Sequence, residues 1–118
     1  MIKLIIERKI KSGKEHEAWD LLHELRSKAL RQKGYISGET LKTFDDPSLW
    51  VAISTWLEAE DWRAWLNSPE RKALEGREKE VIDAPVKATV LEFFEEPFGG
   101  EEQLEQEDIE AEEEAEQK

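Results

Sequence analysis

Two histidines and an aspartate stand at a spacing that could bind a metal ion. His16, Asp20 and His23 are related by i, i+4 and i+7, and imidazole and carboxylate groups are both zinc ligands. At about 100° per residue, however, this trio lies nearly opposite the apolar stripe that contains Leu22 and Leu25. The pattern therefore favours an ordinary exposed helix surface, and we expect no metal site.

The second group of residues with a chemical use is a set of five tryptophans. Trp62 and Trp65 are placed at helical spacing, whereas Trp50 and Trp56 share one side of an expected strand. Core packing explains most such residues. Large rigid rings beside a cleft between helix and sheet also form a surface on which flat aromatic ligands stack. The tryptophans therefore indicate either a packed core or a cavity for an aromatic compound.

The elements that must position these side chains follow from apolar periodicity. Alternating apolar residues predict strands over 2–10, 36–44, 49–56 and 86–94. Helical spacing predicts helices over 14–32, 60–66 and 68–82. Gly34 is expected as a left-handed cap after the first helix, residues 45–48 as a hairpin turn, and Ser68 as the N-cap of the last helix.

This order, β-α-β-β-α-α-β, predicts an α+β fold of the ferredoxin-like split βαβ type. The expected architecture is a four-stranded antiparallel sheet with helices on one face. Residues 1–94 are expected to form this domain. Residues 95–118 contain only two large apolar side chains beyond Gly100, Leu104 and Ile109. We expect this segment to be solvated and dispensable for folding.

The charge is concentrated at the C-terminal end. The chain has 118 residues and a net charge of −12, and residues 95–118 contribute eleven Glu and one Asp against one Lys, a net charge of −11. A surface that binds nucleic acid needs a cationic field, so the balance argues against that class of partner.

Three further classes are disfavoured by composition. The chain has no cysteine, which excludes disulfide scaffolds, thiol catalysis and cysteine-ligated metals. No apolar run approaches the ~20 residues of a membrane span. Charged residues interrupt the first apolar residues too early for a secretory signal, so a soluble cytoplasmic protein is expected.

Five short motifs in order connect the sequence to a known family. They are a Ser-Gly-Lys-Glu motif after the first strand, Gly-Tyr-Ile-Ser-Gly-Glu at 34–39, Ile-Ser-Thr-Trp at 53–56, Trp-Arg-Ala-Trp-Leu at 62–66 and Asn-Ser-Pro-Glu at 67–70. Over residues 1–94 the chain resembles the antibiotic biosynthesis monooxygenase superfamily of dimeric α+β barrels. The resemblance implies small oxygenases, often without a cofactor, that act on quinols and polycyclic phenols, together with haem-degrading enzymes.

The resemblance also supplies candidate site residues. Trp65 matches the family tryptophan, and we expect it to line a substrate pocket with Trp62, Trp19 and Ile6. In haem-degrading members an axial histidine follows that tryptophan by ten residues, and Glu75 stands at this place. A carboxylate is a poor proximal ligand for haem iron, so haem degradation is not expected.

Glu70 stands where quinol-oxidising members carry a histidine after the proline. It lies in the first turn of a predicted helix, where the dipole stabilises a negative charge. This position favours a capping carboxylate over a general base, which needs a raised pKa. Glu70 and Glu75 are nevertheless the two catalytic candidates, because they stand at the places where family members carry histidines. Neither has an evident acid–base partner.

Two functions remain open from the sequence. The first is a cofactor-independent monooxygenase acting on an aromatic compound. The second is a non-catalytic dimeric module that binds an aromatic or lipophilic ligand, and haem binding without degradation is a third alternative.

Both faces of the third and fourth strands are apolar, whereas an antiparallel sheet covered on one side normally has a polar outer face. This pattern predicts a homodimer packed sheet against sheet.

Overall fold

A computed structural model describes residues 1–83 and 85–94 of the chain. The acidic segment expected over residues 95–118 lies outside the described residues. The elements are β1 (Ile2–Lys9), α1 (Glu15–Ala29), β2 (Tyr35–Lys42), β3 (Leu49–Trp56), α2 (Ala59–Leu66), α3 (Pro69–Lys72), α4 (Glu75–Val81) and β4 (Lys87–Glu92). Among the described residues, no helix combines the length and the apolar character needed to cross a membrane.

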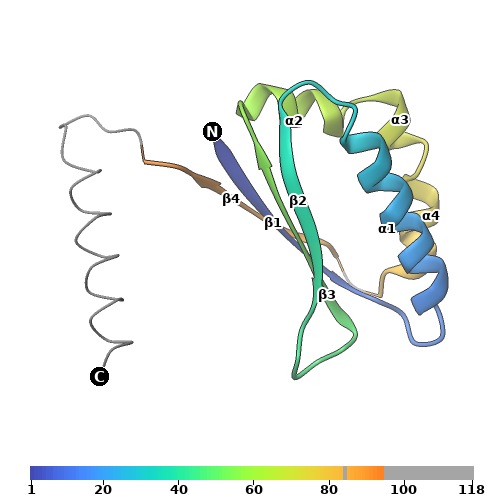
Figure 1. Cartoon of the computed structure of the whole chain (residues 1–118). Coiled ribbons are helices and arrows are strands. Elements are labelled where there is room, and N and C mark those ends of the chain that lie inside the picture. Colours follow the sequence, from blue (N-terminus) through green and yellow to red (C-terminus); the bar gives the residue numbers. More distant parts are fainter. Residues whose placement is uncertain (84, 95–118) are drawn as a thin grey trace, which may run out of the picture.

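The four strands form one antiparallel sheet in the order β2-β3-β1-β4. The helices lie together on one face of this sheet, and none of the described helices lies on the opposite face (Figure 1). The connection β1-α1-β2 leaves room for β3 between its two strands, which is the split βαβ arrangement. The predicted α+β, ferredoxin-like fold is therefore confirmed.

Strand register determines which side chains meet the helices. Leu4 of β1 pairs with Ser54 of β3, and Ile2 pairs with Trp56. Ile2, Leu4 and Trp56 are all buried. Because side chains alternate along a strand, the even-numbered residues of β1 and β3 face the helices. Arg8 shares this side and is also buried.

The helical segment after Ser68 differs from the expectation. The single helix predicted over residues 68–82 is wrong, because α3 ends at Lys72 and α4 begins at Glu75. Ser68 is the N-cap of α3, as predicted, and its hydroxyl accepts from the Arg71 amide at 3.1 Å. Leu74, at the break, is buried in the core, and Glu78 of α4 is buried as well.

The end of α1 is a second correction. The helix stops at Ala29 with Leu30 as its C-cap, so Gly34 is not the cap of this helix. Gly34 nevertheless has the predicted positive φ, 86°. A Cβ at this position would overlap the side chain of Asp61 from α2, and its carbonyl accepts from the Leu57 amide at 2.7 Å. Gly34 thus lets α2 approach the start of β2.

Three Gly→Ala substitutions separate backbone strain from steric overlap. Gly13 has a φ of 84° and open space around it, whereas Gly76 lies in α4 with open space and no positive φ. We expect Gly13→Ala to lower the free energy of unfolding by about 1–2 kcal/mol, Gly34→Ala to lower it by more, and Gly76→Ala to raise it by about 0.5–1 kcal/mol. Urea denaturation measures all three. Equal losses at Gly13 and Gly34 would mean that the contact with Asp61 is unimportant.

Candidate functional site

A cavity of about 100 Å³ lies between the helices and the sheet. Its walls come from β1, β2, β3, α1, α2 and α3. Its lining residues are Leu4, Ile6, Arg8, Leu22, Leu25, Arg26, Ala29, Tyr35, Gly38, Glu39, Thr40, Ala52, Ile53, Ser54, Trp56, Trp62, Trp65, Leu66 and Arg71. The cavity is smaller than an engineered cavity of ~150 Å³ that holds benzene, so it has room for no more than one aromatic ring.

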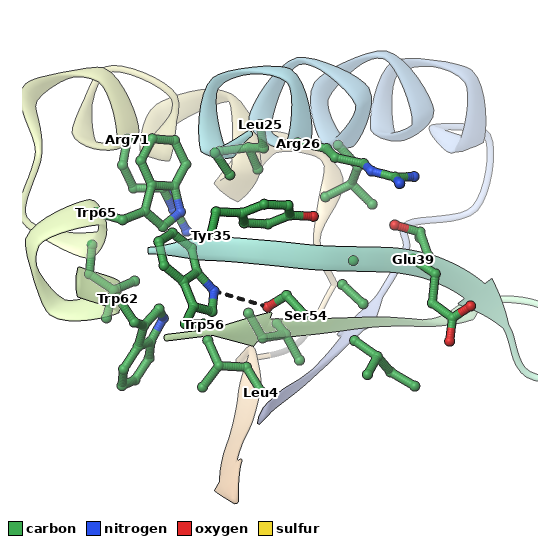
Figure 2. A pocket seen from close by; sticks show the side chains of 18 of the residues that line it. Leu4, Leu25, Arg26, Tyr35, Glu39, Ser54, Trp56, Trp62, Trp65 and Arg71 are labelled. Atoms are coloured by element: carbon green, nitrogen blue, oxygen red, sulfur yellow. Dashed lines mark hydrogen bonds between the residues drawn. The ribbon is translucent and has the colours of Figure 1, made fainter. Parts of the chain in front are cut away.

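Aromatic side chains form one end of the cavity. Trp65 extends from α2 and is 6% exposed, and Trp56 of β3 is 1% exposed. The Tyr35 ring meets Trp56 edge to face, with centroids 5.3 Å apart and planes at 86°, a favourable arrangement for two aromatic rings. Trp56 Nε1 donates to Ser54 Oγ at 3.2 Å, as Figure 2 shows. These contacts fix the rings in place.

A glycine in β2 makes room for one of these rings. A Cβ at Gly38 would overlap the hydroxyl of Tyr35. The bare backbone at Gly38 therefore allows the Tyr35 side chain to lie along the strand toward the cavity. Arg26 of α1 lies at the opposite end, away from Trp62 and Trp65 (Figure 2), whereas Glu39 of β2 pairs with Ile53 and so points to the uncovered face of the sheet.

Three of the four expected pocket residues come together in this cavity. Ile6, Trp62 and Trp65 line it. Trp19 does not, since it is 55% exposed and borders a separate surface groove with Trp50. The reason lies in helix geometry. Ala18 is fully buried, and the next side chain turns about 100° away from the sheet.

The two carboxylates singled out as catalytic candidates lie outside the cavity lining. Glu70 is exposed in the first turn of α3 and accepts from Gln32 Nε2 at 2.8 Å. Glu75 is exposed in the first turn of α4. Each therefore has the setting of a helix N-terminal carboxylate, where the dipole stabilises its charge.

The histidine face of α1 points to solvent. His16 Nε2 lies 3.6 Å from Asp20 Oδ2, and both side chains are more than half exposed. His23 is also exposed, with its ring 6.3 Å from that of Trp19. Within residues 1–83 and 85–94, no group of three or more His, Asp or Glu side chains is arranged to hold a metal ion.

The most unusual feature beside the cavity is one carboxylate shared by two arginines. Glu78 Oε1 accepts from Arg8 Nε at 2.9 Å, and Glu78 Oε2 accepts from Arg71 Nη2 at 2.8 Å. Arg8 is 5% exposed and Glu78 is 7% exposed. Arg8 and Arg71 both line the cavity. We call these three residues the Arg8–Glu78–Arg71 cluster.

The titration of the cluster reflects burial and mutual attraction. Burial alone would raise the pKa of Glu78, but the charges and hydrogen bonds of Arg8 and then Arg71 outweigh it, so this pKa lies below its ordinary value. The pKa of Arg8 lies below its ordinary value, mainly because the side chain is buried. The charge and the hydrogen bond of Glu78 raise this pKa, and the neighbouring charge of Arg71 lowers it. At neutral pH the carboxylate is ionised and the cluster has one excess positive charge.

Sequence reasoning missed this cluster, although a signal exists. Arg8 interrupts the inward side of β1, where Ile2, Leu4, Ile6 and Ile10 are apolar. A charged residue at an inward position of a strand signals a buried ion that needs a partner. Nothing in the pattern alone identifies Glu78 as that partner, because the broken helix that presents it was not predicted.

Comparison with known proteins gives a family and distant relatives. The family model described as antibiotic biosynthesis monooxygenase matches residues 1–77. Protein SchA of Streptomyces halstedii is 25% identical over 69 residues, which cover 58% of this chain and 18% of SchA. The 42.8 kDa protein in the whiE locus of Streptomyces coelicolor is 23% identical over 69 residues, covering 58% of this chain and 17% of that protein. The match therefore spans less than a fifth of these relatives.

Solved structures share the fold at low identity. SnoaB, a cofactor-independent oxygenase from Streptomyces nogalater, superposes with a TM-score of 0.71 and 14% identity over 80% of this chain and 93% of SnoaB. A conserved protein from Methanosarcina mazei gives a TM-score of 0.74 and 16% identity over 79% of this chain and 92% of that protein. At such identities the likeness is one of fold.

Removing the shared carboxylate is expected to destabilise the protein strongly. Glu78→Gln leaves the buried Arg8 and the largely buried Arg71 without a counter-charge, and breaking a buried pair in this way costs about 3–5 kcal/mol. Glu80→Gln, at an exposed position of the same helix, is the matched control and should change the free energy of unfolding by less than about 0.5 kcal/mol. Urea denaturation at pH 7 distinguishes the two.

The same pair of variants tests the pH dependence. Because the pKa of Glu78 is lower in the folded state than in the unfolded state, its stabilising contribution is complete above the unfolded-state pKa and is lost as pH falls through the folded-state value. The wild type should therefore lose stability in acid more steeply than Glu78→Gln. Parallel profiles from pH 7 to pH 3 would contradict this assignment.

Proposed function

Because the chain belongs to the antibiotic biosynthesis monooxygenase family, we propose that it is a small monooxygenase that oxidises a phenolic or quinol-like aromatic compound with O₂ and without a cofactor. The observation that carries the proposal is the cavity walled by Trp56, Trp62, Trp65 and Tyr35. Flat aromatic compounds stack on such rings. The proposed site of action is the cytoplasm, in keeping with the composition of the chain.

The chemistry that suits this cavity needs no redox group from the protein. A phenol loses its hydroxyl proton to solvent as it enters the cavity, and the phenolate passes electrons to O₂. A new carbon–oxygen bond forms at a ring carbon that loses its hydrogen, and the O–O bond breaks. One oxygen atom becomes the second carbonyl of a quinone and the other leaves as water, so phenol and O₂ together balance quinone and water.

The residues of the cavity contribute position and exclusion of water in this scheme. Trp65 and Trp56 hold the ring, and their side chains shield the reacting carbon from bulk water on their side of the cavity. The proposal gives no base role to Glu70 or Glu75, because neither lines the cavity. Ionisation of the substrate must then depend on a low intrinsic pKa of its hydroxyl group or on a neighbouring positive charge that lowers this pKa.

A second candidate function is a binding module without catalysis. It is favoured by the composition of the cavity lining among the described residues, which contains no histidine and only one carboxylate, the exposed Glu39. In that case the aromatic compound binds in the same place and O₂ is not consumed. Oxygen uptake separates the two functions.

The proposed assembly is a homodimer through the uncovered face of the sheet. The register places Ile5 and Ile53 opposite each other on that face, and Leu91 and Phe93 of the last strand region lie on it too, each nearly half exposed. Leu41 of β2 adds a further exposed apolar side chain there. A patch of this kind is typical of an interface, and a second copy would cover it about a two-fold axis.

Sedimentation velocity tests the dimer. We expect twice the 13.8 kDa chain mass at micromolar concentration. Leu91→Glu should shift the protein to monomer, because a buried unpaired charge opposes association. Val90→Glu is the matched control, since Val90 is the neighbouring residue, is equally exposed and points to the other face. Dissociation by both variants alike, or a wild-type monomer, would contradict the sheet-to-sheet interface.

An oxygen electrode tests the activity. We expect the protein to consume O₂ with phenols of one to three rings and to form the corresponding quinones, which absorb visible light. Trp65→Phe should lower kcat/KM about two- to tenfold, the equivalent of about 0.5–1.5 kcal/mol of aromatic stacking. Trp19→Phe, outside the cavity, should leave the rate unchanged. Uptake of ligand without any O₂ consumption would favour the binding module.

A further inference from the structure

One donor in the Arg8–Glu78–Arg71 cluster is left over. Arg71 Nη2 donates to Glu78, but Arg71 Nη1 is buried and has no hydrogen-bond partner among the described residues. A buried guanidinium donor without an acceptor is costly, because its desolvation is not repaid. In Figure 2 the Arg71 side chain extends from the helices toward the sheet, at the end of the cavity where Trp65 and Trp56 lie.

The charges of the cavity are unbalanced in the same direction. Its inner wall carries two arginines, Arg8 and Arg71, against the single carboxylate of Glu78. At the other end of the cavity Arg26 is exposed to solvent, and Glu39, which pairs with Ile53, points to the uncovered face of the sheet. The aromatic end of the cavity therefore has a net charge of +1 in a setting where little water is present to screen it.

From the free donor and the unbalanced charge we infer that the cavity binds an aromatic compound that carries one negative charge, with its anionic oxygen on Arg71 and its ring against Trp65. The class includes aryl carboxylates and ionised phenols. A single negative oxygen would accept from Nη1 and neutralise the cluster. The enclosed volume of about 100 Å³ limits the inserted part to one ring.

This inference deepens the proposed function but does not depend on catalysis. An ionised phenol is the form that reduces O₂, and a guanidinium beside its oxygen would favour ionisation as an opposite charge does for any acid. Arg71 would thus compensate for the absence of a base among the residues that line the inner cavity. For a binding module, the same cluster would select an aromatic anion over its neutral analogue.

Benzoate and benzamide provide the test, because they have the same shape and differ in charge. Binding is measured by tryptophan fluorescence and by ligand-observed NMR, in the absence of any turnover. We expect the wild-type protein to bind benzoate at least tenfold more tightly than benzamide, the advantage typical of a hydrogen bond to a charged group. Equal affinities, or no binding of either at tens of millimolar, would overturn the inference without involving any variant.

Two substitutions locate the preference. Arg71→Gln should abolish it by lowering benzoate affinity at least tenfold and leaving benzamide unchanged. Arg77→Gln, which removes an exposed arginine paired with Glu24, is the matched control and should keep it. Should Arg71→Gln not fold, Arg71→Lys retains the charge and should retain part of the preference. A preference that survives Arg71→Gln would place the anion elsewhere and overturn the assignment to Arg71.

The outcomes separate this inference from the proposed function. Discrimination between benzoate and benzamide without O₂ consumption by any phenol leaves the anion site standing and rejects the oxygenase. O₂ consumption without discrimination between benzoate and benzamide supports the oxygenase and rejects the anion site. Consumption that increases with the ionised fraction of a series of phenols, and loses this dependence in Arg71→Gln, would support both.

Discussion

A single buried carboxylate links the helical layer to the sheet. Glu78 joins Arg8 of β1 to Arg71 of α3 from its own place on α4, so three elements far apart in sequence meet at one ion cluster. Ion pairs of this kind contribute little net stability compared with apolar residues of the same volume. Their geometric requirement is strict, however, since each arginine must present a donor to its own carboxylate oxygen.

The cluster spans the break in the helical segment after Ser68. In a continuous helix Arg71 and Glu78 would share one face but lie two turns, about 10.5 Å, apart along the axis, whereas across the break between α3 and α4 their side chains meet at 2.8 Å. The adjoining α2 is held against the start of β2 by the close approach of Asp61 to Gly34. Trp65 is thereby held close to Trp56. The cavity thus lies between two fixed contacts, the Arg8–Glu78–Arg71 cluster and the contact of Asp61 with Gly34.

Much of this fold could be predicted from apolar periodicity, because the buried strands and α1 follow it closely. The strand 49–56 has the predicted bounds, and Ser68 has the predicted capping role. The break could not be predicted, because the residues at it, Ala73 and Leu74, favour helix and the ion cluster beside it joins residues far apart in the sequence. For the site, the family resemblance indicated Trp65 and Ile6. Trp19 was wrongly expected in the pocket, because its neighbour Ala18 is the residue that faces the sheet. No local sequence pattern identifies Arg71 as a site residue.

The contrast between the two ends of the cavity suggests why the arginines are present at all. The space beside Trp65 and Trp56 could be filled by leucine or isoleucine, and apolar replacement of buried ion groups is often neutral or stabilising. Within the described residues, two arginines for one carboxylate instead leave a donor unpaired and a charge uncompensated, which lowers stability. Departures of this kind from local consistency are concentrated where proteins bind ligands. The same two features that reduce stability, a free guanidinium donor and a small enclosed volume between rigid rings, are those that an aromatic anion would satisfy together.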